Sequence, residues 1–301
     1  MNLKIIVIPI AVLIIGIGMF SFISSNEKLE PSEDVEIIQS KEPGKLIQTN
    51  VPSLFKVMAY ENDFEMIDGK KIWRDVFYEL DESNMTIYDD LKNNKKSAVV
   101  FPIFTAAAYS EPGFYTFYRG DCDQEFHGVL FRDDDCLTVK LEDEYSPLFT
   151  SSANGVQVLN LLDYEIITDI TIHQNPEILL EYEKIILLHN EYVTSIQFDA
   201  ITSHPNVIYL YPNALYAEIE VDYIDETITL IRGHDYPPED PVSNGFDWPF
   251  DNTHPYEYDN ECLNMEFYKV EPGWMTNCYP ENLFLENNQT LIDLLRVLKD
   301  L

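Results

Sequence analysis

The sequence has few positive charges. It contains 19 Lys and Arg residues against 53 Asp and Glu residues, which gives a formal net charge of −34 at pH 7. Nucleic-acid binding needs clustered Lys and Arg side chains that contact phosphates, and anionic membrane surfaces attract the same side chains. We therefore expect neither nucleic acid nor an anionic lipid surface as a partner. A charge this acidic mainly keeps a protein soluble, and it also supplies oxygen ligands for hard cations.

The chain also lacks the motifs of several common enzyme classes. No G-x-S-x-G or G-x-C-x-G sequence follows a predicted strand, so no Ser or Cys nucleophile is indicated. The absence of a P-loop and of G-x-G-x-x-G means that no nucleotide cofactor is indicated. H-E-x-x-H is absent too. His234, Asp235 and His254 could help to bind a metal, but their spacing matches no known pattern.

One long uncharged run stands at the N-terminus, from Ile5 to Ile23 after Lys4. At about 1.5 Å per residue, a helix of this length just spans the hydrocarbon core of a bilayer. Residues 1–25 are therefore predicted to be a membrane anchor, or a signal segment cleaved near Ser25. The positive charge before the run and the acidic residues after it place the N-terminus in the cytoplasm. The bulk of the chain is then extracytoplasmic, as a single-pass membrane protein or a secreted one.

The four cysteines fit this location. An even number of cysteines outside the cell indicates disulfides, and three pairings are possible. The local pairs Cys122–Cys136 and Cys262–Cys278 would each close a short loop and contribute about 3 kcal/mol in the chain-entropy model. A zinc site is the alternative, but no C-x-x-C spacing supports it. We expect disulfides, with the local pairs as the favoured connectivity.

The remaining chain divides into an acidic linker (26–45) and an extracytoplasmic α/β domain (46–301). Its core is expected at 137–232, where short apolar runs alternate with helical segments. Such alternation is typical of a mostly parallel sheet with helices on both faces, as in flavodoxin-like or glutamine amidotransferase-like folds. Strands are predicted at 97–104, 113–118, 137–141, 165–168, 184–188 and 207–211. Helices are predicted after Ser151-Ser152, from Pro176 and over 195–203.

After Ala214 the pattern changes to a period of two, and this predicts an antiparallel hairpin with its turn at 224–226. An acidic loop follows at 233–260, with five prolines, six aromatic residues, seven carboxylates and no Lys or Arg. Long irregular segments in a compact domain are usually functional or cover an edge. The C-terminal segment (261–301) ends in a predicted amphipathic helix at 291–298.

Candidate site residues follow the predicted parallel strands, because ligands in open α/β sheets bind outside the carboxyl ends of the strands. The turn 189–194 and the turn 212–216 occupy that position, and Asp169 follows a third strand. These segments bring several side chains towards one rim: Asp169, His189, Glu191, Tyr192, Asn213 and Tyr216. The alternative is that His189 and Asn213 satisfy backbone groups of the loops while the two tyrosines pack.

Three segments resemble a known family. They are LLDYEIITD at 161–169, HNEYVT at 189–194 and VIYLYPNALY at 207–216. In this order they are similar to steps in the C-terminal domain of the large subunit of N,N-dimethylformamidase. The resemblance covers roughly residues 151–220. It implies a glutamine amidotransferase-like fold without the cysteine nucleophile.

The resemblance also implies an active site with one iron, or another hard cation, held by two tyrosinates and a glutamate. Tyr192 and Tyr216 match the two tyrosine turns. The glutamate has no motif match, so Glu218, Glu261 and Glu266 all stay open. Such an ion would act as a Lewis acid and lower the pKa of bound water. His189 or Glu191 would then be the general base or a partner of the ligands.

Two functions are compatible with the sequence. The first is a membrane-anchored, non-catalytic domain that binds a ligand, an ion or a partner through its acidic surface. The second is a metal-dependent amidohydrolase that acts on the C–N bond of a small amide. The sequence alone does not identify the small-molecule or protein ligand.

Overall fold

The computed structural model describes residues 44–51, 53–67, 69–122, 125–126, 129–130, 136–141, 152–248 and 262–301. The predicted anchor (1–25), most of the linker (26–45) and residues 249–260 of the acidic loop lie outside these ranges. Within the described part, no helix is long and apolar enough to cross a membrane.

A six-stranded sheet forms the centre of the molecule, in the order β10-β6-β11-β13-β17-β16. All neighbouring strands are parallel except β16 and β17. The bounds are Glu165–Thr168 for β10, Ser97–Phe101 for β6, Lys184–Leu187 for β11, Val207–Tyr209 for β13, Trp274–Thr276 for β17 and Phe267–Lys269 for β16. The sheet thus takes one of its inner strands, β6, from a segment before the predicted core.

Alternate residues of these strands face opposite sides of the sheet. Val99, Ile186 and Ile208 pack into one hydrophobic cluster. Their neighbours Ala98, Ile185 and Val207 pack into another. A strand buried on both faces needs an apolar residue at nearly every position, which explains the continuous apolar runs in the sequence. A mixed α/β fold with a mostly parallel sheet is therefore confirmed.

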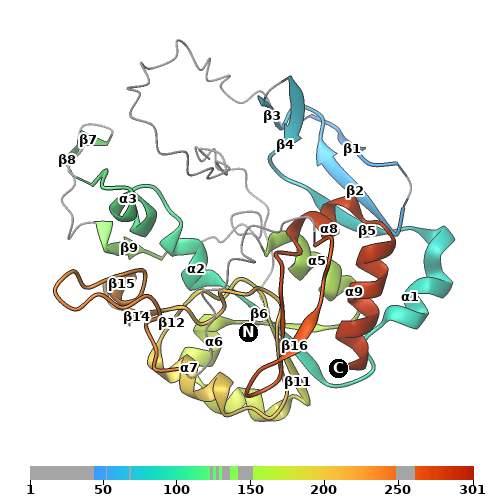
Figure 1. The fold of residues 1–301 in the computed structure, drawn as a ribbon. Helices are drawn as coiled ribbons and strands as arrows, with labels where there is room; N and C mark the ends of the chain where they lie inside the picture. The colour runs from blue at the N-terminus through green and yellow to red at the C-terminus, as the bar shows by residue number, and fades with distance from the viewer. Residues whose placement is uncertain are drawn as a thin grey trace.

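Helices cover both faces of the sheet, as Figure 1 shows. One face carries α1 (Met85–Leu91), α5 (Ala153–Leu161), α8 (Glu281–Glu286) and α9 (Gln289–Asp300). The other carries α6 (Asp169–Gln174), the 3₁₀ helix η2 (Pro176–Glu181) and α7 (Ser195–Thr202). The predicted helices after Ser152, over 195–203 and at the C-terminus are thereby confirmed.

A second sheet, in the order β12-β14-β15-β9, lies beside the carboxyl ends of the central strands. Its hairpin of β14 (Ala217–Asp222) and β15 (Thr227–Arg232) is the predicted antiparallel pair. The other members are β12 (Tyr192–Val193) and β9 (Thr138–Lys140), and the helices α2 (Ile103–Ala108) and α3 (Phe114–Tyr118) pack against it.

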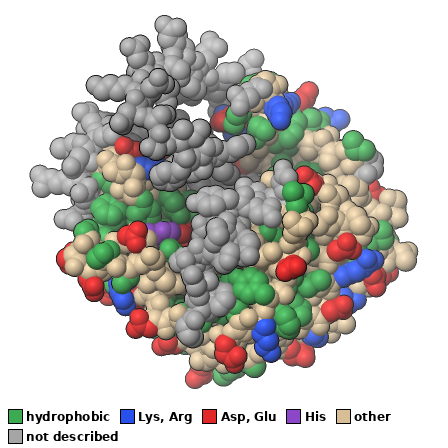
Figure 2. Space-filling view, viewed as in Figure 1, with side chains coloured by type: hydrophobic (Ala, Val, Ile, Leu, Met, Phe, Trp, Pro, Cys, Tyr) green, Lys and Arg blue, Asp and Glu red, His purple; other side chains and the backbone are tan. Residues whose placement is uncertain are grey.

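The N-terminal part of the described chain forms smaller sheets. The first contains β1 (Leu46–Gln48), β2 (Phe55–Tyr60) and β5 (Phe77–Leu80), and its side chains join the cluster beneath α5. Two hairpins, β3 (Phe64–Ile67) with β4 (Lys70–Trp73) and β7 (Glu125–Phe126) with β8 (Val129–Leu130), and the 3₁₀ helix η1 (Glu82–Asn84) complete the elements. On the face shown in Figure 2, acidic side chains are spread over the described surface rather than gathered in one patch.

Some predicted elements differ from the structure. Residues 113–118 were expected to form a strand, but they form helix α3, because the backbone N–H of Gly113 donates to the Thr116 hydroxyl at 2.9 Å and starts a helical turn. Buried packing of Phe114 then outweighs the β-propensity of the aromatic residues. The strand predicted at 97–104 ends at Phe101, since Pro102 follows and α2 begins at Ile103. Helix α6 was not expected, and the Thr168 side chain caps it.

Both predicted disulfides are present, Cys122–Cys136 and Cys262–Cys278, and no cysteine is free. The second bond joins the start of the last described segment to the residues just before α8. Disulfides of this kind are typical of proteins in an oxidising, extracytoplasmic environment.

One acidic side chain, Asp169, is buried at the junction of β10, α2 and α6, with 0% of its surface exposed. Its carboxyl oxygens accept hydrogen bonds from the backbone N–H groups of Phe104 and Ile170, both at 2.8 Å. Burial raises the pKa of Asp169 to about 8, against the lowering effect of these backbone donors. The folded state therefore holds a proton at neutral pH that the unfolded chain releases.

This raised pKa predicts a pH-dependent stability. Because the folded pKa lies above the unfolded value, the contribution of Asp169 is largest below about pH 4 and is lost as the pH rises to about 8. The free energy of unfolding of the wild type should fall relative to that of Asp169→Asn by up to about 1.4 kcal/mol per pH unit between about pH 5 and pH 8. Urea denaturation over this range measures the difference. Asp225→Asn, in the exposed turn of the β14–β15 hairpin, is the control and should follow the wild type. A wild-type–Asp169→Asn difference that stays constant across the range would contradict the assignment.

Candidate functional site

A cluster of polar side chains lies at the carboxyl edge of the central sheet, where the second sheet packs against it. The turn after β11 supplies His189 and Glu191, and the turn after β13 supplies Asn213. Helix α2 and its C-terminal end, helix α3 and the turn after β15 contribute the rest. These residues are Thr105, Tyr109, Tyr115, Tyr118 and His234.

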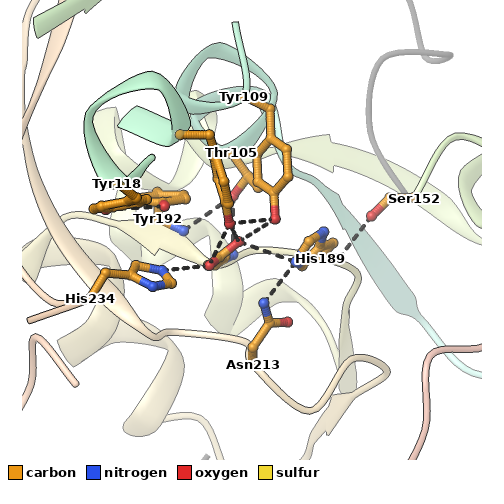
Figure 3. A network of polar contacts seen from close by, with 10 residues as sticks. Thr105, Tyr109, Tyr118, Ser152, His189, Tyr192, Asn213 and His234 are labelled. Carbon is orange, nitrogen blue, oxygen red and sulfur yellow. Dashed lines mark hydrogen bonds and ion pairs between the residues drawn. The ribbon is translucent and has the colours of Figure 1, made fainter. Parts of the chain in front are cut away.

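The carboxylate of Glu191 is the centre of this cluster, and it is only 1% exposed. Dashed lines in Figure 3 converge on one carboxylate from imidazole and phenol groups. The Oε1 atom lies 2.6 Å from Nε2 of His234 and 3.2 Å from the Tyr115 hydroxyl. The Oε2 atom lies 2.8 Å from the Tyr109 hydroxyl and 3.3 Å from Nε2 of His189. Two imidazoles and two phenols therefore surround one buried carboxylate.

These contacts keep Glu191 ionised. Burial raises the pKa of a carboxyl group, but here the hydrogen bonds from His189 and His234 and the favourable electrostatic interaction with those rings outweigh it. The pKa of Glu191 therefore lies well below its usual range. A buried charge is retained at such a cost mostly in functional sites or in structural ion pairs.

The main chain of Glu191 is fixed as firmly as its side chain. The Thr105 hydroxyl accepts hydrogen bonds from the backbone N–H groups of Glu191 and Tyr192, at 3.0 and 3.2 Å. The backbone carbonyl of Glu191 accepts from the N–H groups of Tyr216 and Ala217. Helix α2 and the start of β14 thus hold the residue on either side.

His189 links the cluster to helix α5. Its backbone N–H donates to the Ser152 hydroxyl at 2.8 Å, and its ring stacks on Tyr211 with 5.4 Å between centroids. Its Nε2 atom lies 2.9 Å from the side-chain amide of Asn213. Figure 3 shows this ring joined by dashed lines to Asn213 and to the carboxylate.

His234 is the most accessible imidazole of the cluster, with 24% of its side chain exposed. Its ring lies among tyrosines, with centroid distances of 4.5 Å to Tyr216, 4.9 Å to Tyr118 and 5.7 Å to Tyr192. Its Nε2 faces Glu191, whereas Nδ1 lies on the other side of the ring (Figure 3) and forms no hydrogen bond with the residues that the structure describes. The free nitrogen can therefore exchange a proton with a bound molecule.

The backbone that carries His234 is strained. His234 and Asp235 both have positive φ, 53° and 62°, and Gly233 before them has φ 119°. Non-glycine residues in the left-handed region cost free energy and concentrate at functional sites. This turn aims the imidazole at Glu191 from an element 43 residues away in the chain.

The tyrosines around Glu191 are hydrogen-bond donors rather than anions. Burial, and next the negative charge of Glu191, raise the pKa of Tyr109 and Tyr115 well above the usual value. The Tyr115 hydroxyl also donates to the Tyr109 hydroxyl at 2.7 Å. Both phenols therefore stay protonated at neutral pH.

The structure brings most of the predicted site residues together. His189, Glu191 and Asn213 join the hydrogen-bonded cluster, and Tyr192 and Tyr216 contact His234 through their rings. The other candidates are placed differently. Asp169 caps α2 and α6 instead, Glu218 lies on β14, Glu266 is exposed before β16, and Glu261 lies outside the described residues.

Tyr192 contacts another phenol. Its hydroxyl lies 3.3 Å from the Tyr118 hydroxyl, and burial raises its pKa well above the usual value. The described residues also hold no group of three or more His, Cys, Asp and Glu side chains that could bind a metal ion. The iron site that the resemblance implies stays a prediction.

Several site residues were not expected from the sequence. Thr105, Tyr109, Tyr115 and Tyr118 come from 97–118, where both helices were assigned to strands or missed. His234 was considered only as a possible metal ligand, in a group whose spacing matches no known metal-binding pattern. One signal could have found it: a histidine directly after a glycine at the end of a strand, where a tight turn can direct its side chain back to the sheet edge.

Comparison with protein-family models found no match, and no curated protein that was compared matches the chain.

The turn at Gly233 yields a prediction about the site. A Cβ atom at Gly233 would lie 2.8 Å from Cβ and 2.9 Å from Cα of Ala217, in addition to the strain of its positive φ. Gly233→Ala should therefore displace His234 from Glu191 and lower the free energy of unfolding by about 2–3 kcal/mol. Histidine side-chain NMR signals and urea denaturation measure the two effects.

Gly69→Ala is the matched control for this variant. Gly69 also has a positive φ, of 74°, but a Cβ atom there meets nothing within 4 Å. We expect it to lose only about 1 kcal/mol and to leave the signals of His234 unchanged. Equal effects of the two substitutions would mean that the contact with Ala217 does not position the turn.

Proposed function

We propose that the protein is an extracytoplasmic hydrolase that cleaves the acyl bond of a small neutral amide or ester, with Glu191 and His234 as an acid–base pair. The observation that carries the proposal is the arrangement of one imidazole. His234 has Nε2 on a buried carboxylate, 2.6 Å from Glu191 Oε1, while its Nδ1 bonds none of the described residues and its side chain is partly exposed.

The chemistry follows from the carboxylate–imidazole pair. An ionised carboxylate on one ring nitrogen fixes the tautomer that leaves the other nitrogen with a lone pair, and it stabilises the imidazolium that forms when this nitrogen takes a proton. Nδ1 of His234 would remove a proton from water while the water oxygen attacks the carbonyl carbon. The bond to the leaving nitrogen or oxygen then breaks, and His234 returns the proton to that atom.

The remaining residues of the cluster would hold the pair in place. Tyr109 donates to Oε2 of Glu191 and Tyr115 lies beside Oε1, so the carboxylate keeps one orientation. Ser152 and Thr105 fix the backbone of His189 and Glu191. Water is the nucleophile in this scheme, in accord with the lack of a Ser or Cys nucleophile motif in the sequence. The resemblance noted in the sequence favours amides among the possible substrates.

The test is a hydrolysis assay with two variants. The full chain, purified in detergent, is incubated with a panel of p-nitroanilides and p-nitrophenyl esters of short acids. Glu191→Gln and His234→Gln should each lower kcat/KM by about 10²–10⁴-fold, because each removes one half of the acid–base pair. Glu177→Gln, exposed on η2, and His173→Gln, which bonds Thr194, are the controls and should keep the wild-type rate.

Two results would contradict the proposal. Hydrolysis that survives both substitutions would place the activity elsewhere in the chain. A protein that hydrolyses no member of the panel but still binds a neutral amide such as acetamide through this cluster would be a non-catalytic binding domain, the other function compatible with the sequence.

A further inference from the structure

Asn213 has a buried polar atom that no described residue of the chain contacts by a hydrogen bond. The residue lies in the turn after β13 and is 4% exposed. One end of its side-chain amide contacts Nε2 of His189 at 2.9 Å, and the other end forms no hydrogen bond with any residue that the structure describes. Figure 3 draws a dashed line to His189 from one end of this amide only. A buried polar atom left unsatisfied destabilises the folded protein, so a ligand or water that completes its hydrogen bonding is favoured.

The proton on His189 decides which atom of the amide is the unpaired one. Nε2 of His189 lies 3.3 Å from Oε2 of Glu191, and an ionised carboxylate can only accept hydrogen bonds. Nε2 must therefore carry a hydrogen, and it cannot at the same time accept one from Asn213. Only the oxygen of the amide can face a protonated Nε2 favourably. A half-turn about the last side-chain bond places Oδ1 there at no steric cost, because the two ends of an amide are nearly equal in size.

We infer that Asn213 presents its side-chain NH₂ to the substrate and binds the carbonyl oxygen of the acyl group. This inference rests on the proposed hydrolase function, since that function identifies the carbonyl as part of a substrate. It specifies the class of substrate that the cluster binds. Asn213 is then the residue that orients the acyl group, and its N–H also faces the oxygen on which negative charge develops during attack.

The charge of the cluster selects a neutral carbonyl. His189 joins Asn213 to Glu191, so the unpaired NH₂ lies two hydrogen bonds from a buried negative charge. A carboxylate or phosphate bound to Asn213 would be repelled by Glu191, whereas the oxygen of an amide or ester would not. The site should therefore bind acetamide in preference to acetate.

A second buried amide supports a ligand in this region. Asn190 is 1% exposed and stands in the chain between His189 and Glu191. Neither its oxygen nor its nitrogen has a hydrogen-bond partner among the described residues. Unsatisfied amides at two successive turns of the same sheet edge are typical of a site that a polar ligand completes.

Binding of small probes tests the inference without turnover. The full chain, labelled with ¹⁵N in the asparagine side chains, is titrated with acetamide and with acetate, and the Asn213 signals are assigned by their loss in Asn213→Ala. Acetamide should shift these signals saturably and bind about tenfold more weakly to Asn213→Ala, the effect expected for one hydrogen bond. Acetate should bind more weakly than acetamide. Asn160→Ala, exposed on α5, is the matched control and should bind acetamide like the wild type.

The wild type gives a second readout that needs no variant to fold. ¹⁵N shifts of His189 report whether Nε2 carries a hydrogen, and an unprotonated Nε2 would overturn the inference. Acetamide that binds equally well to Asn213→Ala, or that does not bind saturably to the wild type, would overturn it too. Binding that depends on Asn213, together with no hydrolysis in the substrate panel, would sink the proposed hydrolase and leave the carbonyl site standing. Hydrolysis that is unaffected by Asn213→Ala would overturn the carbonyl site at Asn213 and leave the proposed hydrolase standing.

Discussion

The burial of one negative charge, the carboxylate of Glu191, is the constraint on which the site depends. An ionised carboxyl group out of water is stable only if donors satisfy its oxygens. Four side chains do this, and they come from α3, from the end of α2, from the turn after β11 and from the turn after β15. The second sheet is therefore joined to the central sheet by charge-assisted hydrogen bonds as well as by hydrophobic contact.

The part of the fold that could be predicted from the sequence is the part where neighbouring residues carry the signal. The runs that become β11 and β13 are apolar at nearly every position because both faces of each strand are buried. In the β14–β15 hairpin, apolar and polar residues alternate because one face of the hairpin packs against the protein and the other faces water. Turns at the carboxyl ends of parallel strands converge by topology, so His189, Glu191 and Asn213 could be grouped before any contact was known.

The remaining site residues escaped prediction because their positions depend on long-range packing. Tyr115 and Tyr118 stand in an aromatic segment whose composition favours a strand, but the Gly113 turn and the buried Phe114 make it a helix. His234 depends on a left-handed turn that no periodicity encodes. Glu191 was itself a predicted site residue, as the general base or a partner of the metal ligands, but its place at the centre of the cluster depends on these distant segments.

The distances along the chain between the partners of Glu191 have a consequence for folding kinetics. His234 is 43 residues away from Glu191, Tyr115 is 76 and Tyr109 is 82. Contacts of such separation require the closure of long loops. The chain loses conformational entropy on closing them before the favourable contact forms. The carboxylate stays hydrated until these segments meet, so its desolvation belongs to the last stage of folding. Interactions that form after the transition state mainly slow unfolding. The contacts of Glu191 therefore lower the unfolding rate of the native protein.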